Sequence, residues 1–226
     1  MAVKQEETES DRASDRARAA GLVPEGDLPE LPPLPSSVGE NPPVHVTDEQ
    51  QAHYAEQGYV LFPALIDKQT VAQLSKAVDA MVEHRIGDFS YEPSDPSLIQ
   101  RITNTHRVSA DFQQLLRNEA LCGVIAQLIG PSFRHNNVKL NFKPAGVGSA
   151  VEWHQDWGEP SAANSVHSGA RTHSAVPAGF YPHTNGSVLA AGIFLDDIDS
   201  ENGPCATRLA PLIRFARRIL ARARAS

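Results

Sequence analysis

Alternation between apolar and polar positions divides the chain into helix-like and strand-like segments. The first strong signal is a capping box at Thr47 and Gln50, which predicts a short helix that ends at Gly58. A brief apolar strand is expected at residues 59–62, and Pro63 ends it. The pattern therefore predicts that the folded part of the chain opens near Thr47.

Two longer helices are predicted next, because apolar residues recur every three or four positions. The first is capped by Asp67 and closed by Gly87. Its apolar positions are Val71, Leu74, Val78, Met81 and Val82. The second spans residues 111–129, and Gly130-Pro131 stops it. We interpret both helices as scaffold behind a sheet, with no chemistry of their own.

After Pro131 the spacing changes from helical to strand-like. Residues 138–142 alternate between apolar and polar, as a half-buried strand does. Residues 150–156 are a second strand candidate, and the continuous apolar run 188–195 is typical of a strand that is buried on both faces. Turn-forming residues follow at 201–204. Helices first and strands later indicate an α+β fold.

Three segments do not fit this pattern, and they set the expected domain boundaries. Residues 1–45 carry charges of both signs and then many prolines, so we expect a disordered Pro-rich segment. The predicted domain, residues 46–206, contains an aperiodic insertion at 158–179, which we hypothesise to be a retained intron or a similar artefact. The tail, residues 207–226, holds six arginines and no acid.

The tail has two interpretations. A sequence that is out of frame from about Cys205 would be non-native or disordered, and this interpretation fits the abrupt change of charge. Alternatively, Leu212, Ala216, Ile219 and Leu220 would line one face of a basic amphipathic helix.

Composition narrows the class of protein. The 226 residues suffice for one domain, and the formal net charge of -7 argues against general nucleic-acid binding. Cys122 and Cys205 suggest neither a disulfide framework nor a zinc knuckle. No apolar run reaches membrane-span length, no secretory signal is evident, and the terminal Arg224-Ala225-Ser226 is not a peroxisomal address. We therefore expect an intracellular, cytoplasmic protein.

One short motif carries candidate chemistry. His154 and Asp156 are two residues apart, so on a strand they share a face, about 6–7 Å from each other. An imidazole nitrogen and a carboxylate oxygen can then bind one cation, as two ligands of the 2-His-1-carboxylate triad of Fe(II) oxygenases do. From composition alone, the number of His-x-Asp tripeptides expected by chance in this chain is roughly one half. The alternative is therefore a His–Asp pair that is hydrogen-bonded on the surface and binds no metal.

The sequence blocks around this motif resemble the phytanoyl-CoA dioxygenase family. The most specific are Trp153-His154-Gln155-Asp156 and Phe180-Tyr181-Pro182-His183-Thr184-Asn185. Similar blocks at 139–144, 188–197 and 201–204 follow the family's order, and residues 47–86 are similar too. The resemblance implies N-terminal helices packed on a double-stranded β-helix, a jelly-roll relative of the cupins.

The same resemblance implies a reaction and its cofactors. Members use Fe(II), O₂ and 2-oxoglutarate, and oxidative decarboxylation of 2-oxoglutarate accompanies hydroxylation of a small organic or acyl substrate. Ascorbate is a further cofactor candidate. The expected partner is therefore a small molecule, with no nucleic acid and no membrane span, and the oligomeric state stays open.

The resemblance also implies roles for individual residues. His154 and Asp156 match the first two iron ligands. Lys139 matches a residue near 2-oxoglutarate, and Arg101 lies where a more upstream cationic contact is expected; ordinary solvated charge is the alternative for both. Candidates for the substrate pocket, with core or surface positions as the alternative, are Trp157, Tyr181 and His183.

The chain departs from the family after Pro204. The family's third iron ligand is a distal histidine, and no histidine follows His183 in this sequence. The β-helix would also be incomplete at its C-terminal end. A dioxygenase is the predicted function, with an inactive fragment of one, or a non-catalytic relative that acts as a binding or interaction protein, as the alternatives.

Overall fold

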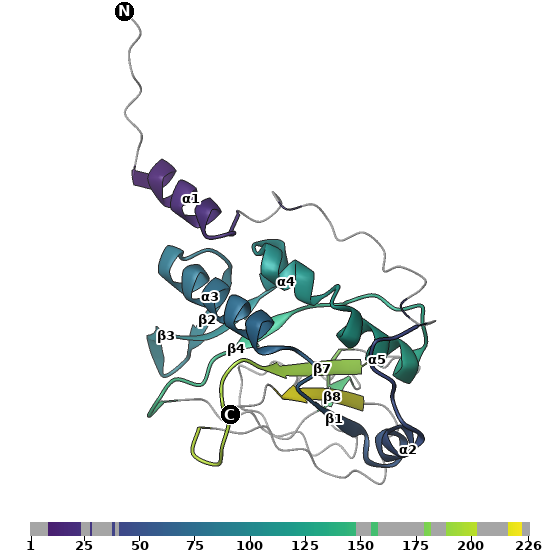
Figure 1. Ribbon diagram of the computed structural model, residues 1–226. Helices are drawn as coiled ribbons and strands as arrows, with labels where there is room; N and C mark the ends of the chain where they lie inside the picture. The colour runs from purple at the N-terminus through teal and green to yellow at the C-terminus, as the bar shows by residue number, and fades with distance from the viewer. Residues whose placement is uncertain are drawn as a thin grey trace, which may run out of the picture.

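The described residues of the computed structural model are 9–23, 28, 38, 41–147, 155–157, 179–181, 189–202 and 217–222. They form a mixed helix and sheet structure, in agreement with the predicted class (Figure 1). The helices are α1 Glu9–Ala19, α2 Asp48–Gln57, α3 Lys68–His84, the 3-10 helix η2 Thr105–Arg107, α4 Ala110–Leu115 and α5 Glu119–Ile129. Within the described residues, no helix has the length and apolar character that a membrane span requires.

The strands form three small sheets. One sheet has the parallel order β1-β8-β7, from β1 Tyr59–Pro63, β8 Arg217–Arg222 and β7 Leu189–Phe194. A second is antiparallel and has the order β2-β3-β4, from β2 Asp88–Glu92, β3 Asp95–Thr103 and β4 Lys139–Asn141. The third pairs β5 Gln155–Trp157 with β6 Gly179–Tyr181 in parallel.

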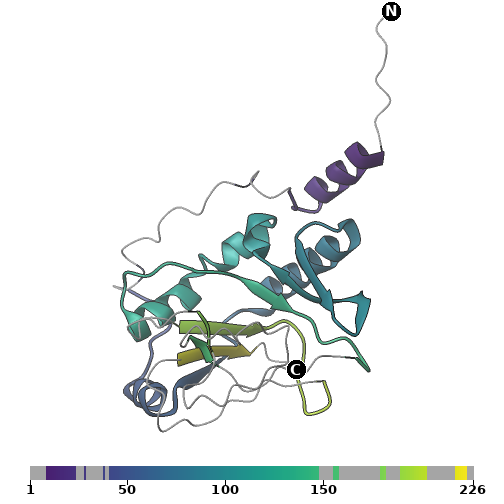
Figure 2. The ribbon, with the colours of Figure 1, turned by 180° about the vertical axis from the view of Figure 1, so that it is seen from behind.

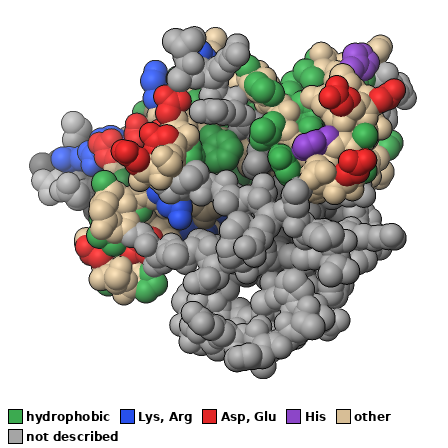
Figure 3. Space-filling model, turned by 90° about the horizontal axis from the view of Figure 1, so that it is seen from below, with side chains coloured by type: hydrophobic (Ala, Val, Ile, Leu, Met, Phe, Trp, Pro, Cys, Tyr) green, Lys and Arg blue, Asp and Glu red, His purple; other side chains and the backbone are tan. Residues whose placement is uncertain are grey.

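Local capping signals place the first helices as predicted. Thr47 and Gln50 form the capping box of α2, and Gly58 ends the helix in the left-handed region at φ 77°. Only Tyr54 of α2 is buried, and acidic and histidine side chains gather at this end of the molecule (Figure 3). Asp67 caps α3 by accepting a hydrogen bond from the Thr70 backbone N–H at 2.8 Å.

The predicted single helix at 111–129 is wrong, because the structure has two helices there. Asn118 lies between them, and its side-chain oxygen accepts a hydrogen bond from the Leu121 N–H at 3.0 Å. This is an N-cap, so α5 begins anew after α4 ends. The spacing of apolar residues did not reveal the break between α4 and α5, because Leu115 before it and Leu121 after it are both buried.

The β2–β3 hairpin was not predicted. Its ladder is irregular, with register shifts on both sides of Tyr91, and this irregularity obscures strand alternation in the sequence. Gly87 joins α3 to β2 at φ +136°, and a Cβ at this position would come within 2.9 Å of the Ile102 side chain. The glycine therefore permits a close approach that no other residue allows without displacing Ile102.

Two hydrophobic clusters hold the described elements together. The larger joins α3, α4 and β3, with Leu74, Met81, Ile102 and Phe112 among its buried members. In Figures 1 and 2, α3 and α4 lie on the same side of the β2-β3-β4 sheet. The smaller cluster joins α2, β1 and α5 through Tyr54, Val60, Phe62 and Val124, together with Val46.

Part of the segment predicted to be disordered, residues 1–45, is ordered. Ala17 in α1 and Leu22 after it are fully buried in the larger cluster. The Val23 N–H donates to the Val108 carbonyl at 3.0 Å, and Leu22 forms a β-bridge with Ser109. Two apolar anchors therefore offset the ordering entropy of a helix whose composition is otherwise charged.

Six residues of the tail pair as a strand. Residues 217–222 form β8, which lies between β1 and β7, so the helical interpretation does not hold for these six residues. Strands on both sides of β8 supply hydrogen-bond partners to its backbone. The spacing of apolar residues, which favoured a helix, carries no information on such pairing. The neighbouring strand β7 was predicted, but most of its residues are half-buried rather than buried on both faces.

Gln127 on α5 fixes the segment that precedes α2. Its side-chain oxygen accepts from the Val46 N–H at 2.9 Å, and its side-chain nitrogen donates to the Val44 carbonyl at 2.8 Å. The segment passes so close to α5 that a Cβ on Gly123 would lie 2.8 Å from Cβ of Pro42. The Gln127 amide thus forms hydrogen bonds with two backbone groups that lie about eighty residues before it in the sequence.

We expect the substitution Gln127→Leu to lower the free energy of unfolding by about 1–3 kcal/mol, because both part-buried backbone groups lose their partner. Urea unfolding followed by circular dichroism measures the change. Gln51→Leu on the exposed surface of α2 is the control and should change stability by less than about 0.5 kcal/mol. Equal losses in the two variants would contradict the role of Gln127.

Candidate functional site

The antiparallel register gives the β2-β3-β4 sheet one apolar face and one polar face. Phe89, Ile102 and Leu140 are paired across the sheet and belong to the larger cluster. Their immediate neighbours point the other way, because side chains alternate along a strand. The resulting polar face consists of two cross-strand rows: Asp88, Thr103 and Lys139, and Ser90, Arg101 and Asn141.

A side-chain hydrogen bond orients Arg101 on this face. Arg101 and Asn141 are directly opposite in the register, and Nε of Arg101 donates to Oδ1 of Asn141 at 3.0 Å. In the next row, the Thr103 hydroxyl donates to the carboxylate of Asp88. The guanidinium keeps its two terminal nitrogens for other contacts, since only Nε is engaged by Asn141.

Lys139 lies diagonally across from Arg101. Lys139 pairs with Thr103, two positions from the Arg101–Asn141 pair, and diagonal neighbours of this kind are roughly 7–8 Å apart. That separation is within reach of two long side chains. The structure therefore brings both of the residues predicted to contact 2-oxoglutarate to one face of one sheet. Two cations and an amide on that face can bind an anion, above all a carboxylate.

The predicted metal ligands are only partly covered by the described residues. Asp156 is the central residue of β5, where a strand was expected, and His154 lies outside the described residues. β5 pairs in parallel with β6, and Trp157 is opposite Tyr181 in the register. Two of the three predicted pocket residues are therefore neighbours in one ladder, and the third, His183, lies outside the described residues.

The described residues offer no second metal centre. Across those ranges, no group of three or more His, Cys, Asp or Glu side chains could hold a metal ion. Nor is Cys122 a nucleophile, because burial raises the pKa of its thiol from 9.0 to about 11. His154 and Asp156 thus stay the predicted ligands, and Arg101, Lys139 and Asn141 form the candidate anion site.

Sequence reasoning missed Asn141, Thr103, Asp88 and Ser90. The position of Asp88, Ser90 and Thr103 on the polar face depends on a hairpin that was not predicted, whose turn follows Glu92. The position of Asn141 depends on the pairing of β4 with β3. A signal was present, because Pro93-Ser94 is a turn-forming pair between the two strands. Once the hairpin is known, alternation assigns Asp88, Ser90 and Thr103 to the face of Arg101, and the β3–β4 pairing adds Asn141.

Comparison with known proteins identifies a family. The model of the family described as phytanoyl-CoA dioxygenase (PhyH) matches residues 54–207, which is more than half of the chain. The match includes β1, the β2-β3-β4 sheet and the predicted metal ligands. No solved structure matches the chain significantly.

Three curated relatives are named as two dioxygenases and one hydroxylase. A "Probable alpha-ketoglutarate-dependent hypophosphite dioxygenase" of Stutzerimonas stutzeri is 29% identical over 70% of this chain and 51% of its own length. The L-proline trans-4-hydroxylase of Streptomyces griseoviridis is 24% identical over 69% and 52%. The ectoine dioxygenase of Streptomyces avermitilis is 27% identical over 66% and 50%. The chain thus spans about half the length of these relatives.

The Arg101–Asn141 contact can be tested directly. We expect Asn141→Ala to speed the exchange of the Arg101 Nε proton with water by about tenfold, because one hydrogen bond from the charged guanidinium is lost. Nuclear magnetic resonance of the arginine side chains measures this exchange. Ser90→Ala changes the residue opposite Arg101 on the other strand and should leave the exchange rate unchanged. An unchanged rate in Asn141→Ala would refute the contact.

Proposed function

Because the chain belongs to the phytanoyl-CoA dioxygenase family, we propose that it acts as an Fe(II)- and 2-oxoglutarate-dependent dioxygenase on a small organic or acyl substrate. The observation that carries the proposal is the family match over residues 54–207. The polar face with Arg101 and Lys139 supports it independently, since its chemistry suits a dicarboxylate.

In this proposal His154 and Asp156 hold the metal. Imidazole and carboxylate are the donor types of the Fe(II) triad, and Asp156 lies on strand β5. When bound, the iron supplies the oxidising chemistry that converts 2-oxoglutarate to succinate and hydroxylates the substrate. Ascorbate, as an auxiliary reductant, belongs to the same proposal.

Arg101 and Lys139 would bind the co-substrate. Each carboxylate of 2-oxoglutarate needs charge-assisted donors, and a guanidinium and an ammonium on one face provide them. Asn141 would act by holding the guanidinium plane in place through Nε. The hydroxyl of Thr103 is already bonded to Asp88, so its contribution would be to keep that carboxylate away from the anion.

The proposal includes the finer features of the fold. We assign the double-stranded β-helix architecture to the domain 46–206, with residues 158–179 as an insertion in it. Trp157, Tyr181 and His183 are proposed for the substrate pocket. The relatives' names specify hypophosphite, L-proline and ectoine, all small and polar, which favours a substrate of similar size.

The alternative is a non-catalytic relative that acts as a binding or interaction protein, because a scaffold of this family can bind a small molecule without turning it over.

Release of succinate from 2-oxoglutarate in the presence of Fe(II) distinguishes the two functions. We expect His154→Ala to lower the rate by at least about 100-fold, because a metal ligand is removed. Gln155→Ala is the matched control, since residue 155 lies between the two predicted ligands in the sequence and is not a predicted ligand itself. Equal rates in the unmodified chain and in His154→Ala would exclude catalysis by this chain and leave the alternative.

Calorimetric titration with 2-oxoglutarate tests the anion site. Arg101→Ala and Lys139→Ala should each weaken binding by about ten- to 100-fold, because each removes a charge-assisted contact. Lys76→Ala removes an exposed charge from α3, in the helical layer, and should leave the affinity unchanged. If all three variants bind alike, the polar face is not the co-substrate site.

A further inference from the structure

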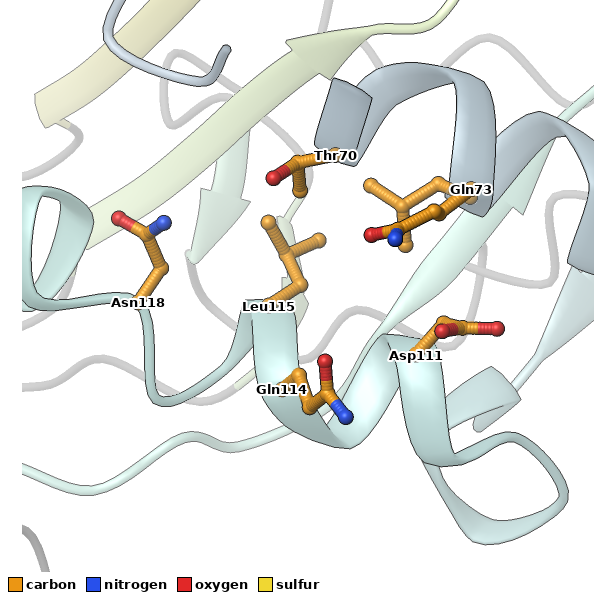
Figure 4. Close-up of a pocket in the computed structure, with 7 residues that line it drawn as sticks. Thr70, Gln73, Asp111, Gln114, Leu115 and Asn118 are labelled. Carbon is orange, nitrogen blue, oxygen red and sulfur yellow. The ribbon is translucent and has the colours of Figure 1, made fainter. Parts of the chain in front are cut away.

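A second polar site lies between the helices, in a pocket of about 210 Å³. In Figure 4, Thr70 and Gln73 come from α3, Asp111, Gln114 and Leu115 from α4, and Asn118 from the turn before α5. Leu74 and Leu115 are buried members of the larger cluster and give the pocket an apolar base. The pocket could hold about seven water molecules, or a compound of similar size.

The charge of the lining is negative. Asp111 is the one charged residue among the seven that line the pocket, and it is half-buried in the first turn of α4. Within the part of the chain that the structure describes, its carboxylate makes no hydrogen bond or ion pair. The same holds for the side-chain amides of Gln73 and Gln114, so three polar groups at this pocket have acceptors to offer.

Thr70 reinforces this character, whereas Asn118 does not. Thr70 donates its hydroxyl proton to the carboxylate of Asp67 at 2.8 Å, which leaves the hydroxyl oxygen as an acceptor. The Asp67 carboxylate, whose pKa is lowered by hydrogen bonds from Thr70, is a negative group beside the pocket. Asn118 uses its oxygen to cap α5 and retains its amide protons.

This pocket is distinct from the candidate anion site. Leu74 and Leu115 belong to the same apolar cluster as Ile102, whose strand carries Arg101 on its opposite face. The apolar layer therefore separates the pocket from the polar face of the β2-β3-β4 sheet. A ligand in one site makes no contact with the other, and the two sites have opposite charge.

We propose that this pocket binds a small organic monocation that carries several N–H donors, such as a guanidinium or primary ammonium compound with a short alkyl chain. The carboxylate of Asp111 pairs with the cationic group, and Gln73, Gln114 and Thr70 accept its remaining protons. The alkyl chain lies on Leu74 and Leu115. A monocation matches the single charge of the lining, and the volume limits it to a few non-hydrogen atoms beyond the charged group.

Titration of the full chain with ethylguanidinium, followed by ¹H–¹⁵N nuclear magnetic resonance, tests the proposal. We expect saturable shifts confined to the amides of residues 70–74 and 111–118, with a Kd of about 1 mM, which a compound of this size can reach. Ethylurea has the same shape without the charge and should cause no saturable shift.

Substitutions then locate the contact. Asp111→Asn should weaken ethylguanidinium binding by about tenfold or more, because the charge-assisted hydrogen bonds are lost. Asp79→Asn makes the same change of charge on α3, away from the pocket, and should leave the Kd unchanged. Unperturbed spectra elsewhere show that each variant is folded. Equal binding of ethylurea, equal Kd values in the two variants, or no shift at all would overturn the proposal.

Discussion

The register of β3 against its two neighbours is the constraint on which the described structure depends. Ile102 pairs with Phe89 on one side and with Leu140 on the other, so three apolar residues face the helices together. A slip of one residue would turn Arg101 and Thr103 into the core and expose Ile102, which is fully buried. Burial of a charged guanidinium without a partner costs far more than the pairing gains. The same register therefore sets both the core and the polar face.

The packing of the helices depends on the register of β3. α3 and α4 pack over the apolar face through Leu74, Met81 and Phe112. Ala17 and Leu22 join the same cluster, which explains why a charged N-terminal helix is ordered there. At the other end, Gln127 ties the segment before α2 to α5. The chain before the matched family region is thus held at two points, one apolar and one polar, and each acts over a long sequence separation.

Sequence reasoning succeeded where the determinants are local and failed where they are not. The caps at Thr47 and Asp67 involve residues three positions apart, so α2 and α3 could be predicted. Alternation likewise predicted β4. The position of β8 depends on pairing with strands 28 and 159 residues away, as the pairs Leu189–Arg217 and Tyr59–Arg218 show, and no local sequence pattern predicts such pairing. Asn141 was missed for the same reason, because its partner Arg101 lies forty residues earlier.

Opposite charge on the two sides of one apolar layer has a physical consequence. Arg101 and Lys139 attract anions on the sheet side, whereas Asp111 and the nearby Asp67 attract cations on the helix side. Each ligand class is therefore excluded from the other site by repulsion rather than by shape alone. The sites nevertheless share the packing of Leu74 and Leu115 against the Ile102 cluster. A cation in the pocket would change binding at the sheet only if it favours one arrangement of α3 and α4 over another, because coupling requires differential affinity.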